Sequence, residues 1–143
     1  MMISTKGPYA LRIIVDLAEH QTNGYLPLKE IALRQEVSEK YMEGILKILV
    51  QNKILSGLRG KGGGYRLAMP PEDCTIGSIL RLTEGTLAPV ACLGQQPQDC
   101  PRKDKCRTLP MWRRLDALIG DFFDHITVAD LMCPAPPAEQ DRP

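Results

Sequence analysis

The chain has 143 residues, enough for one compact domain with an accessory helix and too few for two catalytic domains. Its start lacks the apolar core and cleavage site of a secretory signal, and no apolar run approaches the roughly 20 residues that cross a bilayer, so we expect a cytoplasmic protein with no membrane segment. The net charge is only +1, but residues 1–66 hold ten Lys and Arg against six Asp and Glu, whereas residues 67–143 hold eight against eleven. The basic first half is typical of a surface that meets a polyanion.

The first fifty residues predict three helices. Thr5 is placed as an N-cap, and apolar residues recur after it at helical spacing until the turn signal Asn23-Gly24. A second helical run covers Leu28 to Gln35, and a two-residue link leads to Ser38, which is placed to cap the third helix. The segment is therefore predicted to form a helix, a tight turn and a helix.

The third helix has two different faces when about 100° is assigned to each residue. Apolar residues share one arc: Met42, Ile45, Leu46, Leu49 and Val50. Basic and polar residues share the other: Lys40, Tyr41, Gly44, Lys47 and Gln51. On a recognition helix in the major groove of DNA, Lys and Tyr would reach phosphates or base edges, and glycine would let the backbone come close at a helix cost of roughly 1 kcal/mol. An ordinary solvated helix surface has the same pattern, so this helix alone does not decide between the two interpretations.

Two short strands are predicted next, Ile54 to Leu58 and Tyr65 to Ala68, on either side of a loop with four glycines. This is a β-hairpin wing, since glycine permits the positive φ angles of a tip that lies close to a surface. Arg59 and Lys61 add positive charge suited to a narrow minor groove. A nucleotide-binding loop is excluded, because the loop leads into a strand instead of a helix and lacks the Gly-Lys-Ser/Thr ending.

Three cysteines share one short polar stretch: Cys92, Cys100 and Cys106. Thiolates gathered on a loop commonly serve iron, zinc or redox chemistry. The chain has five cysteines, an odd number that in a reducing compartment favours ligands or sensors over a disulfide framework. Zinc is disfavoured, because the sequence lacks the Cys-x-x-Cys pairs of structural zinc sites. Cys74 and Cys133 have no neighbour at ligand spacing and are expected to be small buried or incidental residues.

A long amphipathic helix is predicted after the cysteines. Its apolar residues fall within an arc of about 140°: Met111, Trp112, Leu115, Leu118, Ile119, Phe122, Phe123 and Ile126. The stripe is wider than a two-helix seam needs, so we expect one edge to cover the protein's own head and the other to pack on a second subunit, with an ordinary core helix as the alternative. Thr127 and Asp130 are placed to cap a short final helix, and the proline-rich residues 133–143 are expected to be a disordered tail.

With these residues in view, the chain from Met1 to about Met132 resembles the IscR, NsrR and CymR group of bacterial winged-helix regulators. The matching segments, in chain order, are Ser4-Thr5-Lys6-Gly7 with Tyr9-Ala10, Pro27-Leu28, Ser38 with Tyr41 and Glu43, Arg59-Gly60 with Gly62-Gly63-Gly64-Tyr65, the three cysteines, and Trp112. The resemblance implies a mainly α fold with a small β-hairpin wing. Its predicted parts are a winged helix-turn-helix DNA-binding domain over 1–85, a cysteine-containing sensor loop over 86–108, a dimerisation helix and short terminal helix over 109–132, and the tail.

The resemblance also implies which residues meet DNA. The recognition-helix positions are Ser38, Lys40, Tyr41, Glu43 and Gly44, and the minor-groove positions of the wing are Arg59 and Gly60. Lys47 and Lys61 join this set because of their charge and their place on the same helix face and wing. Lys40 and Gly44 replace smaller or amide side chains expected in IscR, so the operator sequence is expected to differ.

Members of the group that sense iron–sulfur state bind the cluster with three cysteines in this order. Cys92, Cys100 and Cys106 match it with a first spacing longer by two residues, and soft thiolates bind iron strongly. The positions expected to supply a fourth ligand hold Leu109 and Pro8. The fourth ligand therefore stays open among several donors: Asp99, Asp104, His20, Glu19, Cys74 or an exogenous thiol.

We therefore predict a homodimeric transcription regulator, a repressor, that binds a pseudo-palindromic operator in double-stranded DNA. An iron–sulfur cluster or the thiol redox state of the cysteine loop would modulate that binding. The first alternative is a cluster-free regulator of the same family that responds to a small metabolite or a partner protein. A small metallo-redox enzyme is disfavoured, because the only histidines are His20 and His125 and no pairing of nucleophile and base is evident.

Overall fold

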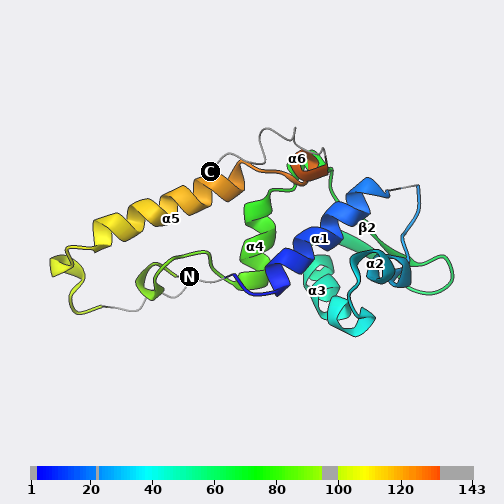
Figure 1. Ribbon diagram of the computed structural model, residues 1–143, viewed down its shortest axis with the longest axis horizontal. Helices are drawn as coiled ribbons and strands as arrows, with labels where there is room; N and C mark the ends of the chain where they lie inside the picture. Colours follow the sequence, from blue (N-terminus) through cyan, green and yellow to red (C-terminus); the bar gives the residue numbers. More distant parts are fainter. Residues whose placement is uncertain (1–2, 22, 95–99, 133–143) are drawn as a thin grey trace.

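The molecule consists of a rounded head and one long helix that leads away from it (Figure 1). The computed structural model describes residues 3–21, 23–94 and 100–132. The helices are α1 (Lys6–Glu19), α2 (Leu28–Gln35), α3 (Glu39–Gln51), α4 (Ile76–Glu84), α5 (Leu109–Asp124) and α6 (Val128–Met132), with 3-10 turns η1 (Pro71–Asp73), η2 (Ala91–Leu93) and η3 (Lys103–Lys105). The strands are β1 (Leu55–Leu58) and β2 (Gly64–Leu67). The prediction of a mainly α fold with a hairpin wing is confirmed.

The head is built around the apolar faces of α1 and α3. Ile13 and Ile14 of α1 and Leu46 of α3 have no exposed surface, and they meet Ile31 of α2 and Ile79 of α4 in one core. The five residues predicted for the inner arc of α3 all lie in or against this core. Burying aliphatic side chains of this size contributes roughly 1.5 to 3 kcal/mol each, so packing of these helices fixes the orientation of α3.

Local signals set the helix-turn-helix boundaries. The Ser38 hydroxyl accepts a hydrogen bond from the Tyr41 amide at 3.2 Å, which confirms the predicted cap of α3. Glu36 ends α2 in a left-handed conformation with φ 55°. Thr5 precedes α1 as predicted, but its side chain does not cap that helix; the hydroxyl lies 2.9 Å from the Tyr41 hydroxyl instead.

A buried carboxylate holds α2 against α1. Asp16, only 3% exposed, accepts hydrogen bonds from Arg34 at 2.7 and 3.0 Å and from Gln35 at 2.8 Å. Burial raises the pKa of Asp16, but the hydrogen bonds from Arg34 and Gln35 outweigh it and leave the pKa below its ordinary value. Arg12 of α1 adds a bond at 2.6 Å to the Gln35 carbonyl at the end of α2.

The wing is antiparallel, with Leu55 opposite Leu67 and Leu58 opposite Gly64. Residues 25–27 extend it, because Leu26 and Tyr65 exchange backbone hydrogen bonds of 2.9 and 2.8 Å. Gly64 has φ 145°, and a Cβ there would overlap the Leu26 carbonyl, so this close pairing requires glycine.

The long helix α5 is fixed to the head near its C-terminal end. Asp124 pairs with Arg81 of α4 through contacts of 2.6 and 3.1 Å, and the Ile76 amide donates to the Ile126 carbonyl at 2.8 Å. Thr127 and Asp130 bond to each other's backbone amides at 2.9 and 3.3 Å, so the predicted cap of α6 is confirmed. Within the residues given above, no helix is long and apolar enough to cross a membrane. The predicted tail lies outside the described residues.

Candidate DNA-binding surface and cysteine loop

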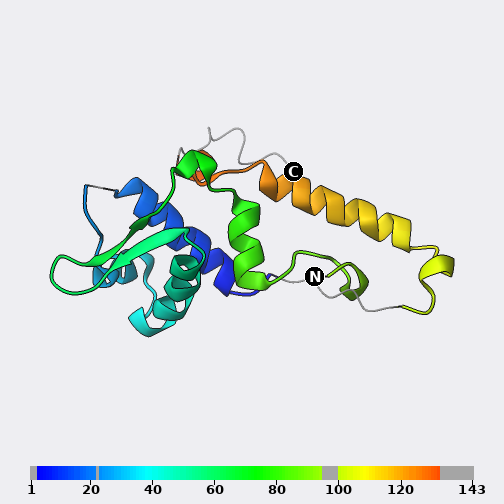
Figure 2. The same ribbon diagram turned by 180° about the vertical axis from the view of Figure 1, so that it is seen from behind.

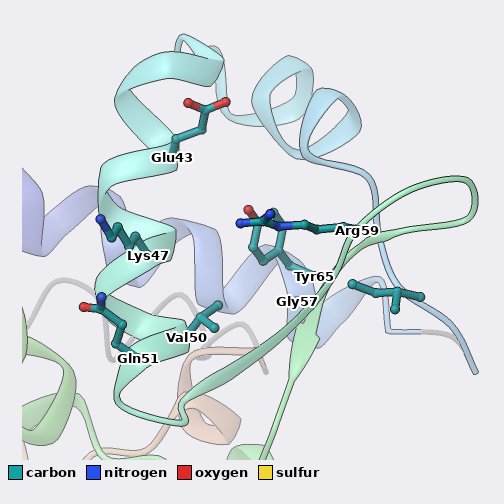
Figure 3. A pocket seen from close by; sticks show the side chains of 9 residues that line it. Glu43, Lys47, Val50, Gln51, Gly57, Arg59 and Tyr65 are labelled. Atoms are coloured by element: carbon teal, nitrogen blue, oxygen red, sulfur yellow. The ribbon is translucent and has the colours of Figure 1, made fainter.

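A groove of about 470 Å³ lies between α3 and the wing (Figure 3). Glu43, Lys47 and Gln51 line one side from successive turns of α3, and Arg59 reaches across from the wing. The Tyr65 ring packs beside Gly57 on the floor of the groove. We call this the wing groove. Its walls combine carboxylate, ammonium, amide and guanidinium groups, which can donate to and accept from base edges.

The cationic residues of this surface are not neutralised by the protein. Lys40, Lys47, Arg59 and Lys61 are exposed, and none of them takes part in the ion pairs that the described residues form. At the wing tip, Gly60 and Gly62 have φ 92° and 77°, which places Lys61 on a tight turn clear of the core. Free positive charge on a protruding hairpin favours a polyanion.

A second hollow of about 480 Å³ lies at the start of α3, where Ser38, Lys40, Tyr41 and Gly44 line it together with Lys6 of α1. The sequence did not single out Lys6 as a DNA contact, because only folding brings the start of α1 beside α3. The available signals were the basic excess of residues 1–66 and the matching segment Ser4-Thr5-Lys6-Gly7. The Tyr41 ring packs edge-to-face on Tyr9 with centroids 5.5 Å apart, so the side chain is half-buried, unlike the exposed Lys40. Its hydroxyl therefore positions α3 as well as facing this hollow.

The predicted site residues lie in two places. Those from α3, together with Arg59, line the two hollows, and Gly60 and Lys61 lie at the wing tip beside them. The cysteines lie on the segment between α4 and α5 (Figure 1). Cys92 lies in η2 and is half-buried, Cys100 is exposed, and Cys106 is half-buried just before α5. The described cysteines are all free thiols.

The surroundings of the Cys106 thiol favour its ionised form. Its Sγ lies 3.4 Å from the Thr108 hydroxyl. Hydrogen bonds from that hydroxyl and from the amides of Thr108 and Leu109 lower its pKa, and Arg102 adds a smaller electrostatic effect. Burial instead raises the pKa of Cys74 to about 11. Cys74 has no exposed surface, which fits the prediction of a small buried residue.

Three accessible or partly accessible thiols match iron–sulfur chemistry in their donor atoms. In the described residues, however, no three His, Cys, Asp or Glu side chains form a group able to hold a metal ion. Leu109 is buried at the first position where a fourth ligand was expected. His20 and Glu19 lie at the end of α1 far from the segment that follows α4, and Asp99 lies outside the described residues. Asp104, in η3 beside Cys106, stays a possible donor.

Comparison with known proteins agrees with this architecture. The model of the Rrf2 family, described as an iron-dependent transcriptional regulator, matches residues 3–134. The regulator IscR of Sodalis glossinidius is 32% identical over 132 residues, covering 92% of this chain and 79% of that protein, and IscR of Vibrio cholerae is 33% identical over 92% and 75%.

Solved structures give the same result. CymR, the global cysteine regulator of B. subtilis, superposes with a TM-score of 0.74 at 32% identity, covering 92% of this chain and 96% of CymR. T. potens IscR superposes with a TM-score of 0.72 at 31% identity, covering 100% and 94%. The predicted resemblance and the prediction of a protein that is not an enzyme are confirmed. The chain belongs to the Rrf2 family of transcriptional regulators.

Proposed function

We propose that this regulator binds duplex DNA through α3 and the wing and that the cysteine loop controls the binding. The observation that carries the proposal is the set of unpaired cations around the wing groove, on the outer face of α3 and on the wing. In this arrangement α3 enters the major groove with Lys40 and Lys47, and Arg59 enters the adjacent minor groove. Glu43 can accept from a cytosine amino group.

Binding to duplex DNA as a function of salt tests this part. Log affinity for a selected operator should fall linearly with log salt, with a slope that counts the neutralised phosphates. A competing random duplex gives the specificity ratio. Equal affinity for the operator and the random duplex at every salt concentration would contradict a sequence-reading role.

The outer face of α5 supports a homodimer. Met111, Leu115, Leu118 and Phe122 follow one another at spacings of three and four residues and are 53, 38, 63 and 62% exposed. Ile119 and Phe123, on the adjacent edge, pack against the head. A second copy that covers the exposed stripe would place two recognition helices for half-sites about 34 Å apart, one turn of DNA. Leu118→Glu, within the stripe, should convert the dimer to a monomer in size-exclusion chromatography with light scattering. Arg113→Glu, at an exposed residue of α5 outside the stripe, should leave the dimer intact.

The cysteine loop is proposed as the sensor, with Cys92, Cys100 and Cys106 as the cluster ligands. A bound iron–sulfur cluster would supply sensitivity to oxygen and redox state. The chain itself would bring three thiolates together across the loop. The lowered pKa of Cys106 favours the thiolate form of one of them. Anaerobic purification and reconstitution, followed by iron, sulfide and visible-absorbance measurements, test this. A colourless, iron-free protein would count against the cluster.

A cluster-free thiol switch is the second candidate, favoured by the same activated Cys106. The two candidates separate in one experiment. DNA affinity that follows iron and sulfide loading supports the cluster, whereas affinity that follows thiol oxidation of the iron-free protein supports the switch. In either case we propose that the regulator acts as a repressor, with the responsive form set by the loop.

A further inference from the structure

Two sets of hydrogen bonds, linked through the backbone of residues 4–7, connect the end of α4 to the start of α3. Glu84, the last residue of α4, accepts three bonds: from the Ser4 amide at 3.0 Å, the Ser4 hydroxyl at 2.8 Å and the Gly7 amide at 3.0 Å. These amides belong to the start of α1, where backbone donors have no partner within the helix. Thr5, between them, continues the chain through its hydroxyl to Tyr41, 2.9 Å away.

The close approach of α4 to α1 depends on Gly7. A Cβ at this buried glycine would lie 2.7 Å from Glu84 Oε1 and 2.9 Å from Leu80 Cδ2. Any larger residue would displace the ends of these two side chains, including the carboxylate that accepts the bonds from Ser4 and Gly7. The absence of a side chain at Gly7 therefore leaves room for the Glu84 carboxylate beside the Gly7 amide.

Glu84 also lies where the cysteine loop leaves the head. Gly85 follows it with φ 81° and turns the chain into the segment that carries Cys92 (Figure 2). Both views place the end of α4 beside the start of α1 (Figures 1 and 2). A displacement of the loop thus acts first on the residue that accepts the bonds from Ser4 and Gly7.

We propose that Glu84 is a positioning residue: it fixes the start of α3 through Ser4, Thr5 and Tyr41, and it transmits the state of the cysteine loop to the DNA-binding surface. The proposal rests on the proposed function. When the loop is rearranged, the last turn of α4 moves together with the Glu84 carboxylate, and the start of α1 moves with it. The hydrogen bond between the hydroxyls of Thr5 and Tyr41 then changes. Lys40 and Gly44, which line the same hollow as Tyr41, then change their placement on DNA.

Glu84→Gln in the full-length protein tests the proposal. The variant keeps the shape of the side chain but turns an amide donor toward the amide donors of α1. Operator affinity is measured for three preparations: reduced and iron-free, reconstituted with iron and sulfide, and oxidised with diamide, which accepts the hydrogens of paired thiols. The wild type should show at least about a fivefold difference between the reduced preparation and one of the others, the lower end of typical allosteric coupling. In Glu84→Gln the ratio should fall to about one.

Two further variants separate positioning from folding. Tyr41→Phe removes the hydroxyl link and should also bring the ratio close to one, and the double variant with Glu84→Gln should be no worse than either single variant. Glu72→Gln, at an exposed glutamate of η1, is the control and should keep the wild-type ratio. If Glu84→Gln does not fold, Ser4→Ala replaces it, because it removes one donor and leaves the carboxylate.

The possible outcomes are distinct. A folded Glu84→Gln protein with the full wild-type ratio would overturn the proposal. A wild type that binds DNA equally in all three preparations would instead overturn control by the loop in the proposed function. If the changes in binding free energy caused by Glu84→Gln and Tyr41→Phe add in the double variant, the two residues act independently, and the positioning role is overturned as well.

Discussion

The head and the cysteine loop are held in place by contacts of very different range. In the head, Asp16 binds Arg34 eighteen residues away, and Glu84 binds Ser4 eighty residues away. In the described parts of the loop, 86–94 and 100–108, the side-chain hydrogen bonds are local: from the Ala88 amide to the Thr86 hydroxyl, between Cys106 and Thr108, and from the Leu109 amide to Cys106. Long-range hydrogen bonds therefore fix the geometry of the head, whereas the loop is attached to the core through Leu87 and its hydrogen bonds are local.

This difference matches the two roles proposed for the regulator, DNA binding by the head and sensing by the cysteine loop. A DNA-binding surface must keep its spacing, so it lies on helices with a common core. The proposed sensor would have to change shape at small cost, and the short turns and partly exposed thiols of the cysteine loop are consistent with that. The following experiments test that division from the largest expected effect to the smallest.

Removing core volume should affect the head most. Ile79 has no exposed surface, so Ile79→Ala should lower the free energy of unfolding by about 2 to 5 kcal/mol. Cys100→Ala, at an exposed loop position, should change it by less than about 0.5 kcal/mol. Urea denaturation of both variants measures the contrast. Similar losses for the two would mean that the loop is part of the folded core.

Removing the buried carboxylate of Asp16 should destabilise the protein by an amount that depends on pH, whereas removing an exposed carboxylate should not. Asp16→Asn leaves Arg34 with a neutral partner and should cost about 1 to 3 kcal/mol at neutral pH. The pKa of Asp16 in the folded protein lies below its ordinary value of 3.8, so its stabilisation is present above that pH and is lost as the pH falls through the folded value. Stability curves from pH 7 to 2.5 should converge for wild type and variant at the acid end. Asp73→Asn, at an exposed residue, should leave the curve unchanged.

Removing a wing cation should weaken DNA binding without affecting the fold. Arg59→Ala should cost roughly 1 to 3 kcal/mol of specific affinity and leave the free energy of unfolding within about 0.5 kcal/mol. Arg113→Ala, on the exposed face of α5, serves as the matched control. Fluorescence anisotropy with an operator duplex measures the effect. An unchanged affinity for Arg59→Ala would place the wing outside the interface.

The smallest effect is chemical and needs no substitution. Cys106 has a lowered pKa and Cys74 a pKa of about 11, so Cys106 holds more thiolate at any neutral or mildly alkaline pH. Iodoacetamide at pH 7.5 should therefore modify Cys106 faster than Cys74, as followed by peptide mass spectrometry. Comparable rates would show that the head opens as readily as the loop.

Much of the fold follows from local sequence signals. Ser38 and Thr127 cap their helices as predicted, because a cap needs only a hydroxyl and the next turn. The hairpin was located to within one residue, because glycine marks its tip. The predicted domain boundaries stay predictions, and the structure does not test which residues touch DNA.

Contacts between distant segments were not predictable in the same way. The bond from Leu26 to Tyr65, the Arg34 pair of Asp16 and the three bonds to Glu84 all depend on how helices pack. Nothing near these residues in the sequence selects their partners, since each side chain would suit an exposed surface equally well. The same reason hid Lys6 from the predicted surface. At the cysteines, the sequence identified the sulfur atoms as ligand atoms. How the three thiols come together would depend on the species that they bind.

The anchoring of α5 has an evolutionary consequence. The chain departs at Gly85 and is caught again where the Ile126 carbonyl meets the Ile76 amide, at the opposite end of the same short helix. Between Gly85 and the start of α5 at Leu109, a change in chain length would carry little entropic penalty, since each doubling of a flexible loop costs only about 0.6 kcal/mol. Residues could therefore be gained or lost around Cys92 and Cys100 while the core of the head and the attachment of α5 through Asp124 and Ile126 stay the same.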